Sequence, residues 1–152
     1  PSTPLPPSNK PLKTHQYEAS FCPADGSSCY AFTAGVTVDP IRLNSLREFG
    51  SAEEVGNKIA AAAKARDGVT KTTVTFALEY VDGEDVYYDV TYEEVGKRGE
   101  KTVYTRTFVG GGKLFVFTGT VKNSGGGENG YQEMEDVKNS FRVSTTPPKT
   151  SQ

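Results

Sequence analysis

The sequence predicts an α+β fold in which helices pack on an antiparallel β-sheet. Four segments between residues 73 and 121 alternate apolar and polar side chains with a period of two, and short turns join them. A helical pattern precedes these segments and another follows them. Because a chain of 152 residues is long enough to bury one hydrophobic core, we expect one domain at residues 17–143, between two terminal segments.

Residues 1–16 are rich in proline, with Ser, Thr, Asn and Lys in between, which is typical of an extended polyproline-like arm. Near its end the arm carries a basic cluster formed by Lys10, Lys13 and His15. A cationic arm can dock on the carboxylates of a partner protein, and a solubilising linker is the alternative role. We therefore take Lys10, Lys13 and His15 as candidate partner-binding residues.

The two cysteines, Cys22 and Cys29, flank the turn-forming segment Pro23–Ser28. A turn of this composition can bring their Cα atoms within disulfide range. Their spacing fits neither a Cys-x-x-Cys redox motif nor a zinc-binding pattern. We predict a structural disulfide between Cys22 and Cys29, with free thiols or a redox-active pair as the alternatives.

A first helix is expected from Ser51, because Ser51 and Glu54 have the spacing of a capping box. Apolar residues then recur on one face of this helix at Val55, Ile59 and Ala63. Gly68 predicts its C-terminal end. The predicted inner face is small and rich in alanine, so the helix can lie close to a sheet.

Four strands should follow the first helix. They are expected near residues 73–80, 86–92, 103–109 and 114–121. Turns at Asp82–Asp85 and Gly110–Gly112 form two hairpins, and connections this short require antiparallel pairing. Residues 79–94 contain seven acids and no Lys or Arg, whereas residues 97–113 contain five basic residues and one acid. The second and third strands should therefore attract each other across the ladder.

A second helix should close the fold after the glycine-rich loop at residues 124–128. Its apolar residues recur at helical spacing at Tyr131, Met134, Val137 and Phe141. Asn129 is the expected N-cap, with Gln132 three residues later. Residues 144–152, with two adjacent prolines, are expected to form a flexible C-terminal tail.

The residue pattern gives little support for catalysis. The single histidine, His15, lies in the arm, where it cannot be held by packing as the base of a Ser-His-Asp or Cys-His arrangement. A strand rather than a helix follows Gly110–Lys113, which indicates a hairpin turn and not a phosphate-binding loop. The acidic turn Asp82–Asp85 lacks EF-hand spacing and is interpreted as a polar turn, with weak calcium binding as the alternative. We expect no catalytic residues, no metal ligands and no directly bound cofactor.

Composition excludes two further classes of protein. A net charge of −2 argues against non-specific nucleic-acid binding, which depends on many Lys and Arg contacts to phosphates. No apolar run approaches the roughly 18 residues needed to span a bilayer. The chain begins at Pro1 without an apolar signal segment, as expected of a processed mature form.

Three motifs lie in register at Ser45–Val55, Gly112–Thr120 and Ser140–Val143, and together they resemble the PsbP family. The segment from Ser45 to Val55 is similar to the family's turn Ser-Leu-x-x-Phe-Gly-Ser-x-Glu-Glu-Val, which follows a strand. The second hairpin leads into a Gly-Lys-Leu strand at Gly112–Thr120, and the last helix ends in the Ser-Phe-x-Val motif at Ser140–Val143. The resemblance covers residues 34 to 143 and implies an α/β/α sandwich around an antiparallel sheet.

The resemblance also implies a location and a role. PsbP-like proteins are non-catalytic proteins of the chloroplast thylakoid lumen, peripheral to the thylakoid membrane. The main members bind the photosystem II core beside other extrinsic lumenal subunits. They stabilise the oxygen-evolving complex and help retain the calcium and chloride that its manganese cluster needs. Other PsbP-domain proteins act as assembly or stabilising factors of photosystem I or photosystem II.

Within the family, the N-terminal arm matters for ion retention, which favours Lys10, Lys13 and His15 by their position. The chain departs from the family at the start of the domain, where Cys22 and Cys29 replace a usual Gly-Phe-x-Phe-x-x-Pro-x-x-Trp segment. The histidine-containing metal site of some plant members is not expected, because the predicted domain contains no histidine.

Overall fold

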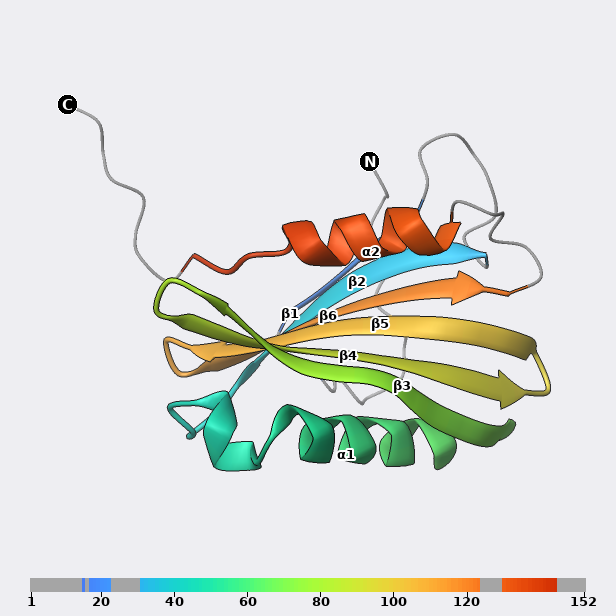
Figure 1. Ribbon diagram of the computed structural model, residues 1–152, viewed down its shortest axis with the longest axis horizontal. Helices are drawn as coiled ribbons and strands as arrows, with labels where there is room; N and C mark the ends of the chain where they lie inside the picture. The colour runs from blue at the N-terminus through green and yellow to red at the C-terminus, as the bar shows by residue number, and fades with distance from the viewer. Residues whose placement is uncertain (1–14, 16, 23–30, 124–129, 145–152) are drawn as a thin grey trace.

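The computed structural model describes residues 15, 17–22, 31–123 and 130–144. This part of the chain forms one six-stranded antiparallel sheet with a helix on each face (Figure 1). The strands are β1 (Tyr17–Phe21), β2 (Phe32–Pro40), β3 (Val69–Asp82), β4 (Asp85–Gly96), β5 (Gly99–Gly110) and β6 (Lys113–Lys122). The predicted α+β class and α/β/α sandwich are confirmed.

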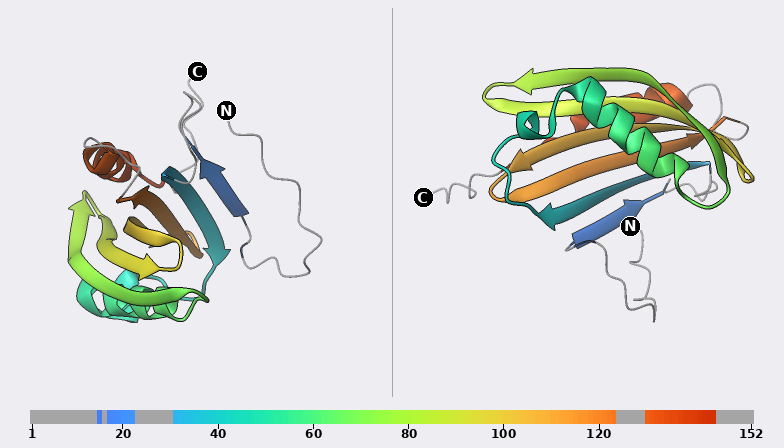
Figure 2. Two further views of the ribbon diagram at one scale, coloured as in Figure 1. Left: turned by 90° about the vertical axis from the view of Figure 1, so that its right-hand side faces the viewer. Right: turned by 90° about the horizontal axis from the view of Figure 1, so that it is seen from below.

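The strand order is β1-β2-β6-β5-β4-β3, so the predicted meander from β3 to β6 is confirmed. Strand β2 pairs with β6, which closes the meander on one side, and β1 extends the sheet beyond β2. The connection from β2 to the opposite edge runs through α1 (Ala52–Lys64), which covers β3 and β4. Helix α2 (Gly130–Ser140) covers β5 and β6 on the other face (Figure 2).

The capping pattern differs in detail from the prediction. The Ser51 hydroxyl accepts a hydrogen bond from the Glu54 amide at 3.2 Å, so the predicted N-cap is confirmed. The complete capping box, however, begins a short 3₁₀ helix at Leu46–Phe49, where the Glu48 carboxylate accepts from the Ser45 amide at 3.1 Å. Helix α1 ends at Lys64 rather than at Gly68, because residues 65–68 form the turn into β3.

Strand β3 contains a β-bulge that the alternation of its side chains did not reveal. Val74 pairs with Tyr92, but Phe76 pairs with Thr91, so Thr75 is an extra residue in the ladder. Val74 therefore packs beneath α1, whereas Phe76 faces the side of the sheet that α2 covers. An uninterrupted alternation over residues 73–80 would place both residues on one face, but the inserted residue reverses the side-chain alternation.

The charge complementarity predicted for the second and third strands is confirmed. Strands β4 and β5 pair so that Asp89 lies opposite Arg106, and Glu94 lies opposite Lys101. The atoms Arg106 Nε and Asp89 Oδ1 are 2.6 Å apart, and Lys101 Nζ and Glu94 Oε2 are 3.1 Å apart. Opposite charges therefore contribute to the register of this pair of strands.

Both helices approach the sheet closely because small residues lie at the contacts. A Cβ atom built on Gly56 of α1 would lie 3.2 Å from a Val90 methyl carbon on β4. On the other face, the fully buried side chain of Met134 lies directly over Gly119 of β6. The core is thus divided by the sheet into an α1 side and an α2 side.

Candidate functional site

Of the predicted basic cluster, the structure describes His15. Its Nδ1 atom lies 2.7 Å from Asp39 Oδ2, and both side chains are partly buried. Asp39 is close to the end of β2, so this contact joins the segment before β1 to the second strand of the sheet. Lys10 and Lys13 lie outside the described residues, and the partner-binding role of all three residues stays a prediction.

The predicted disulfide is only partly within the described residues. Cys22 directly follows β1 and is exposed. Cys29 lies outside the described residues. The pairing of Cys22 with Cys29 stays a prediction, although no free cysteine is found in the described part of the chain.

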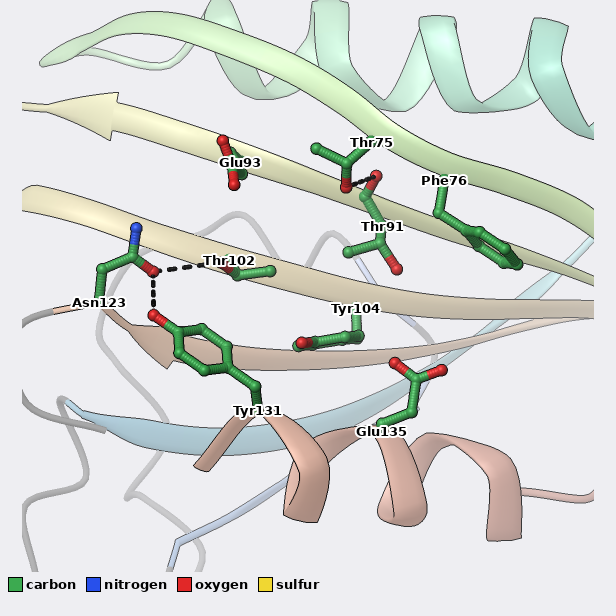
Figure 3. A pocket seen from close by; sticks show the side chains of 9 residues that line it. All are labelled: Thr75, Phe76, Thr91, Glu93, Thr102, Tyr104, Asn123, Tyr131 and Glu135. Atoms are coloured by element: carbon green, nitrogen blue, oxygen red, sulfur yellow. Dashed lines mark hydrogen bonds between the residues drawn. The ribbon is translucent and has the colours of Figure 1, made fainter. Parts of the chain in front are cut away.

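A groove of about 370 Å³ lies between α2 and strands β3 to β5; we call it the α2 groove (Figure 3). It is lined by Thr75, Phe76, Thr91, Glu93, Thr102, Tyr104, Asn123, Tyr131 and Glu135. At one end, Asn123 Oδ1 accepts hydrogen bonds from the Tyr131 hydroxyl at 2.7 Å and from the Thr102 hydroxyl at 3.1 Å. These bonds tie the start of α2 to β5 and to the end of β6.

The floor of the α2 groove includes Tyr104, which is only 7% exposed. Burial raises the pKa of its phenol above the ordinary value of 10.0, and the Glu135 carboxylate and Tyr131 raise it further. A negative tyrosinate would be poorly solvated here and close to another negative charge. The neutral phenol is therefore the form that the fold stabilises.

This raised pKa predicts a loss of stability in alkali. The unfolded chain releases its tyrosine protons above a pH of about 10, whereas folded Tyr104 holds its proton to higher pH. The free energy of unfolding should be unaffected below that pH and should fall as the pH rises through the folded pKa, by at most about 1.4 kcal/mol per pH unit for this group. Urea denaturation over this pH range should show a shallower fall for Tyr104→Phe.

Thr75→Val is the matched control, since it alters the same groove without removing an ionisable group. It should keep the wild-type pH dependence. If Tyr104→Phe also keeps the full dependence, the phenol is not protected in the way that its burial indicates.

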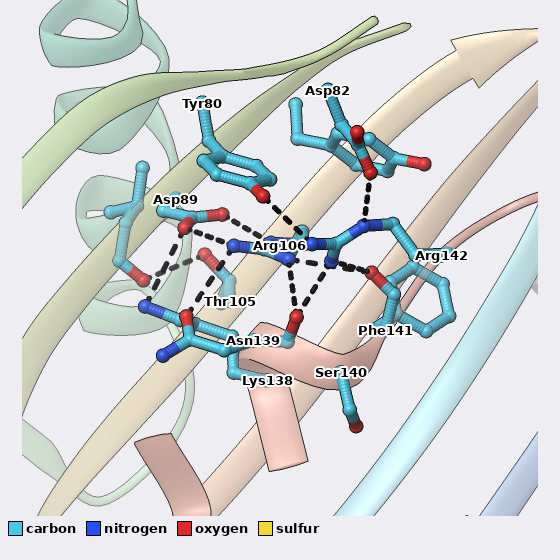
Figure 4. Close-up of polar contacts among 12 residues, drawn as sticks. Tyr80, Asp82, Asp89, Thr105, Arg106, Lys138, Asn139, Ser140, Phe141 and Arg142 are labelled. Carbon is cyan, nitrogen blue, oxygen red and sulfur yellow. Dashed lines mark hydrogen bonds and ion pairs between the residues drawn. The ribbon is translucent and has the colours of Figure 1, made fainter. Parts of the chain in front are cut away.

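A second polar cluster lies between the sheet and the C-terminal part of α2 (Figure 4). The Arg106 guanidinium donates to both oxygens of Asp89, at 2.6 and 2.7 Å, and its side chain is 1% exposed. Lys138 Nζ lies 3.5 Å from the same carboxylate and 3.0 Å from Glu135 Oε1. We call Arg106, Asp89 and Lys138 the buried charge triad.

Contacts of the triad join the sheet to the end of α2. Arg106 also donates to the backbone oxygen of Asn139 at 3.2 Å, and its guanidinium carbon lies 4.5 Å from the centre of the Tyr80 ring. The charge pattern of the two strands predicted attraction of the kind that Asp89 and Arg106 make, but Lys138 was missed. A signal was present, because Lys138 lies four residues after the buried Met134 and therefore on the same helix face.

The described residues show a polar groove and charged structural contacts. Within the described ranges, no group of three or more His, Cys, Asp or Glu side chains is arranged to hold a metal ion. No helix there has the length and hydropathy needed to cross a membrane.

The fold and its surface define a class of protein: an α/β/α sandwich whose polar clusters lie between an antiparallel sheet and a C-terminal helix. A family model described as PsbP matches residues 31–143, and the chain belongs to the PsbP family. This range runs from the residue before β2 to the residues after α2 and includes all three motifs that carried the resemblance. The family predicted from those motifs is thus confirmed.

A named relative supports this assignment over part of the chain. The chain is 31% identical over 83 residues to the chloroplastic PsbP domain-containing protein 2 of Arabidopsis thaliana. The matched segment covers 54% of this chain and 36% of the relative. The similarity therefore spans little more than a third of the relative's length.

Two solved structures share the fold. The solution structure of the cyanobacterial PsbP (CyanoP) of Synechocystis sp. PCC 6803 superposes with a TM-score of 0.61 at 14% identity, covering 81% of this chain and 79% of that one. The crystal structure of PA94, a Pseudomonas aeruginosa protein of unknown function, gives a TM-score of 0.54 at 11% identity, covering 90% and 85%. At these identities the likeness shows the fold alone.

Proposed function

We propose that this protein is a non-catalytic extrinsic subunit of photosystem II in the chloroplast thylakoid lumen, peripheral to the thylakoid membrane. In this role it stabilises the oxygen-evolving complex and helps retain calcium and chloride near the manganese cluster. The observation that carries the proposal is the PsbP family match across residues 31–143. The chloroplastic name of the Arabidopsis relative supports the location.

The described contacts are consistent with a role in binding rather than in chemistry. The buried charge triad uses its charged groups to hold α2 on the sheet. His15, the single histidine of the sequence, pairs with Asp39. In the proposed role the protein acts by covering part of the photosystem and limiting the escape of ions, with no cofactor of its own.

The proposed partners are the photosystem II core and its other extrinsic lumenal subunits. Lys10, Lys13 and His15 are the residues that we propose to dock on acidic groups of that assembly. The contact between His15 and Asp39 ties the last residue of the basic cluster to β2, so this end of the cluster lies against the domain.

Salt washing of photosystem II membranes tests the proposal. High salt should release the protein, because screening weakens attraction between exposed charges. Oxygen evolution at low calcium and chloride should then fall, and the purified protein should restore it. A protein in which Lys10, Lys13 and His15 are all replaced by Gln should restore less activity than a matched control with Lys58→Gln, an exposed residue of α1.

The proposal fails if salt leaves the protein bound, or if its removal leaves oxygen evolution unchanged at low calcium and chloride. Equal recovery with the triple variant and the control would refute the role of the arm alone.

The second candidate function is that of an assembly or stabilising factor for photosystem I or photosystem II. The name of the curated relative, a PsbP domain-containing protein, favours it. Native gel fractionation followed by immunoblotting separates the two functions. An assembly factor should occur with subcomplexes and be absent from the mature oxygen-evolving complex.

A further inference from the structure

We infer that the α2 groove binds an arginine side chain presented by a partner protein. In this arrangement the guanidinium lies between Glu93 and Glu135 and stacks on the aromatic floor, while the flanking partner residues contact β3. Three features of the groove carry the inference, and none of them depends on the proposed role in a photosystem.

The first feature is charge. Two carboxylates, Glu93 from β4 and Glu135 from α2, line the groove, and none of its nine lining residues is basic (Figure 3). Glu135 already has Lys138 at 3.0 Å. Glu93 is exposed and has no ion pair in the described part of the chain. A cation entering the groove therefore meets a carboxylate without a counter-ion.

The second feature is an unpaired polar group. The Tyr104 side chain is more than nine-tenths buried and lies in the groove between β5 and α2, yet its hydroxyl makes no hydrogen bond within the described residues. Among the described residues only Thr107 has a fully buried side-chain polar atom without a partner, so the Tyr104 hydroxyl oxygen is open to the groove. An arginine N–H can donate to this oxygen, because the guanidinium presents five donors in one plane.

The third feature is the aromatic and apolar surface. Phe76, Tyr104 and Tyr131 offer ring faces of the kind on which a guanidinium stacks. Phe76, which lines the groove, and Leu78, beyond it, are 44% and 57% exposed on β3, the strand at the edge of the sheet. This exposed apolar pair favours a protein segment over a small free cation, because flanking residues of a protein can cover it.

The test is an NMR titration of the whole protein with four probes. Two are N-acetyl-arginine amide and N-acetyl-citrulline amide, which have nearly the same shape but differ in charge. The other two are blocked tripeptides with arginine between two leucines or between two serines. Saturable shifts should appear at residues 93, 104 and 135 with the arginine probes and not with citrulline. The leucine-flanked peptide should bind several times more tightly than the serine-flanked one.

Variants locate the site. Glu93→Gln should weaken binding of the leucine-flanked peptide roughly threefold to tenfold, because one carboxylate is lost from the cation's surroundings. Glu84→Gln, in the exposed turn between β3 and β4, is the matched control and should leave the affinity unchanged. Glu93 is exposed, so its variant should fold normally.

Each contrary outcome overturns a defined part of the inference. Equal shifts with citrulline would exclude recognition of charge. Equal affinity of arginine amide and the leucine-flanked peptide would indicate a small-molecule site and not a protein-docking site. Shifts confined to other surfaces would remove the groove from consideration. The titration contains no photosystem, so its failure is distinct from failure of the proposed function.

Discussion

Replacing Asp89 with Asn is expected to lower the free energy of unfolding by about 3–5 kcal/mol, because it leaves buried cations without their shared carboxylate. Arg106 donates two hydrogen bonds to Asp89, and Lys138 lies beside it. Both cationic side chains are at most 2% exposed. Without Asp89, two buried positive charges face each other, with Glu135 as the remaining carboxylate in contact with either of them.

Urea denaturation monitored by circular dichroism measures this effect. The matched control is Asp82→Asn, which removes the carboxylate 2.7 Å from Arg142 Nε. Because both side chains of that pair are well exposed, the control should lower stability by no more than about 1 kcal/mol. Similar losses for the two variants would show that burial does not amplify the Asp89 contact.

A second substitution separates charge from packing. Adding Lys138→Met to Asp89→Asn removes one of the uncompensated cations while keeping an apolar stem on the same helix face. The double variant should be more stable than Asp89→Asn alone. If it is less stable, the loss does not arise from unpaired buried charge.

Gly119→Ala is expected to lower the free energy of unfolding by about 1–3 kcal/mol through overpacking. A Cβ atom at position 119 would overlap the sulfur of Met134 and would lie 2.8 Å from its Cγ. Met134 is fully buried, packed with Tyr104, Phe117 and Val121, so its flexible side chain has little room to move aside. We expect α2 to be pushed away from β6. A lower midpoint of thermal unfolding would measure the resulting loss of stability.

Gly56→Ala is the matched comparison on the other face of the sheet. Its new Cβ would lie 3.2 Å from a Val90 methyl carbon, which is tight but without overlap. Alanine also improves helix propensity by about 1 kcal/mol, so the net change should be small.

In the Gly119→Ala background, Met134→Ala should be less damaging than in the wild type. Additive losses would show that the two residues do not compete for space.

Much of the fold was predictable because it depends on local patterns. The alternation of side chains located β4, β5 and β6 to within a few residues, and the short turns required their antiparallel pairing. Helix α1 was expected from its serine cap and its alanine-rich face. The acidic composition of β4 and the basic composition of β5 predicted that these strands attract each other. The pair of Asp89 and Arg106, which belongs to the buried charge triad, is an example of this attraction.

The candidate sites were less predictable, because they join residues that are distant in the sequence. The bulge at Thr75 sends Phe76 and Leu78 to the α2 side, and an alternating pattern does not show where an extra residue interrupts it. The spacing of Lys138 from Met134 places it on the inner face of α2, but its partner Asp89 is known only once α2 is placed over the sheet. The α2 groove likewise exists only where Glu93 and Glu135 meet across the space between sheet and helix.

The sequence by itself determined the strands of the meander, the helices, the turns between them and the PsbP family, because each depends on neighbouring residues or on motifs in order. The tertiary structure alone decided that β2 lies beside β6, that Lys138 of α2 is buried against the sheet and that two carboxylates share a groove with a buried tyrosine. Burial and charge pairing arise from side chains on separate elements, so they are set when sheet and helix pack and not before.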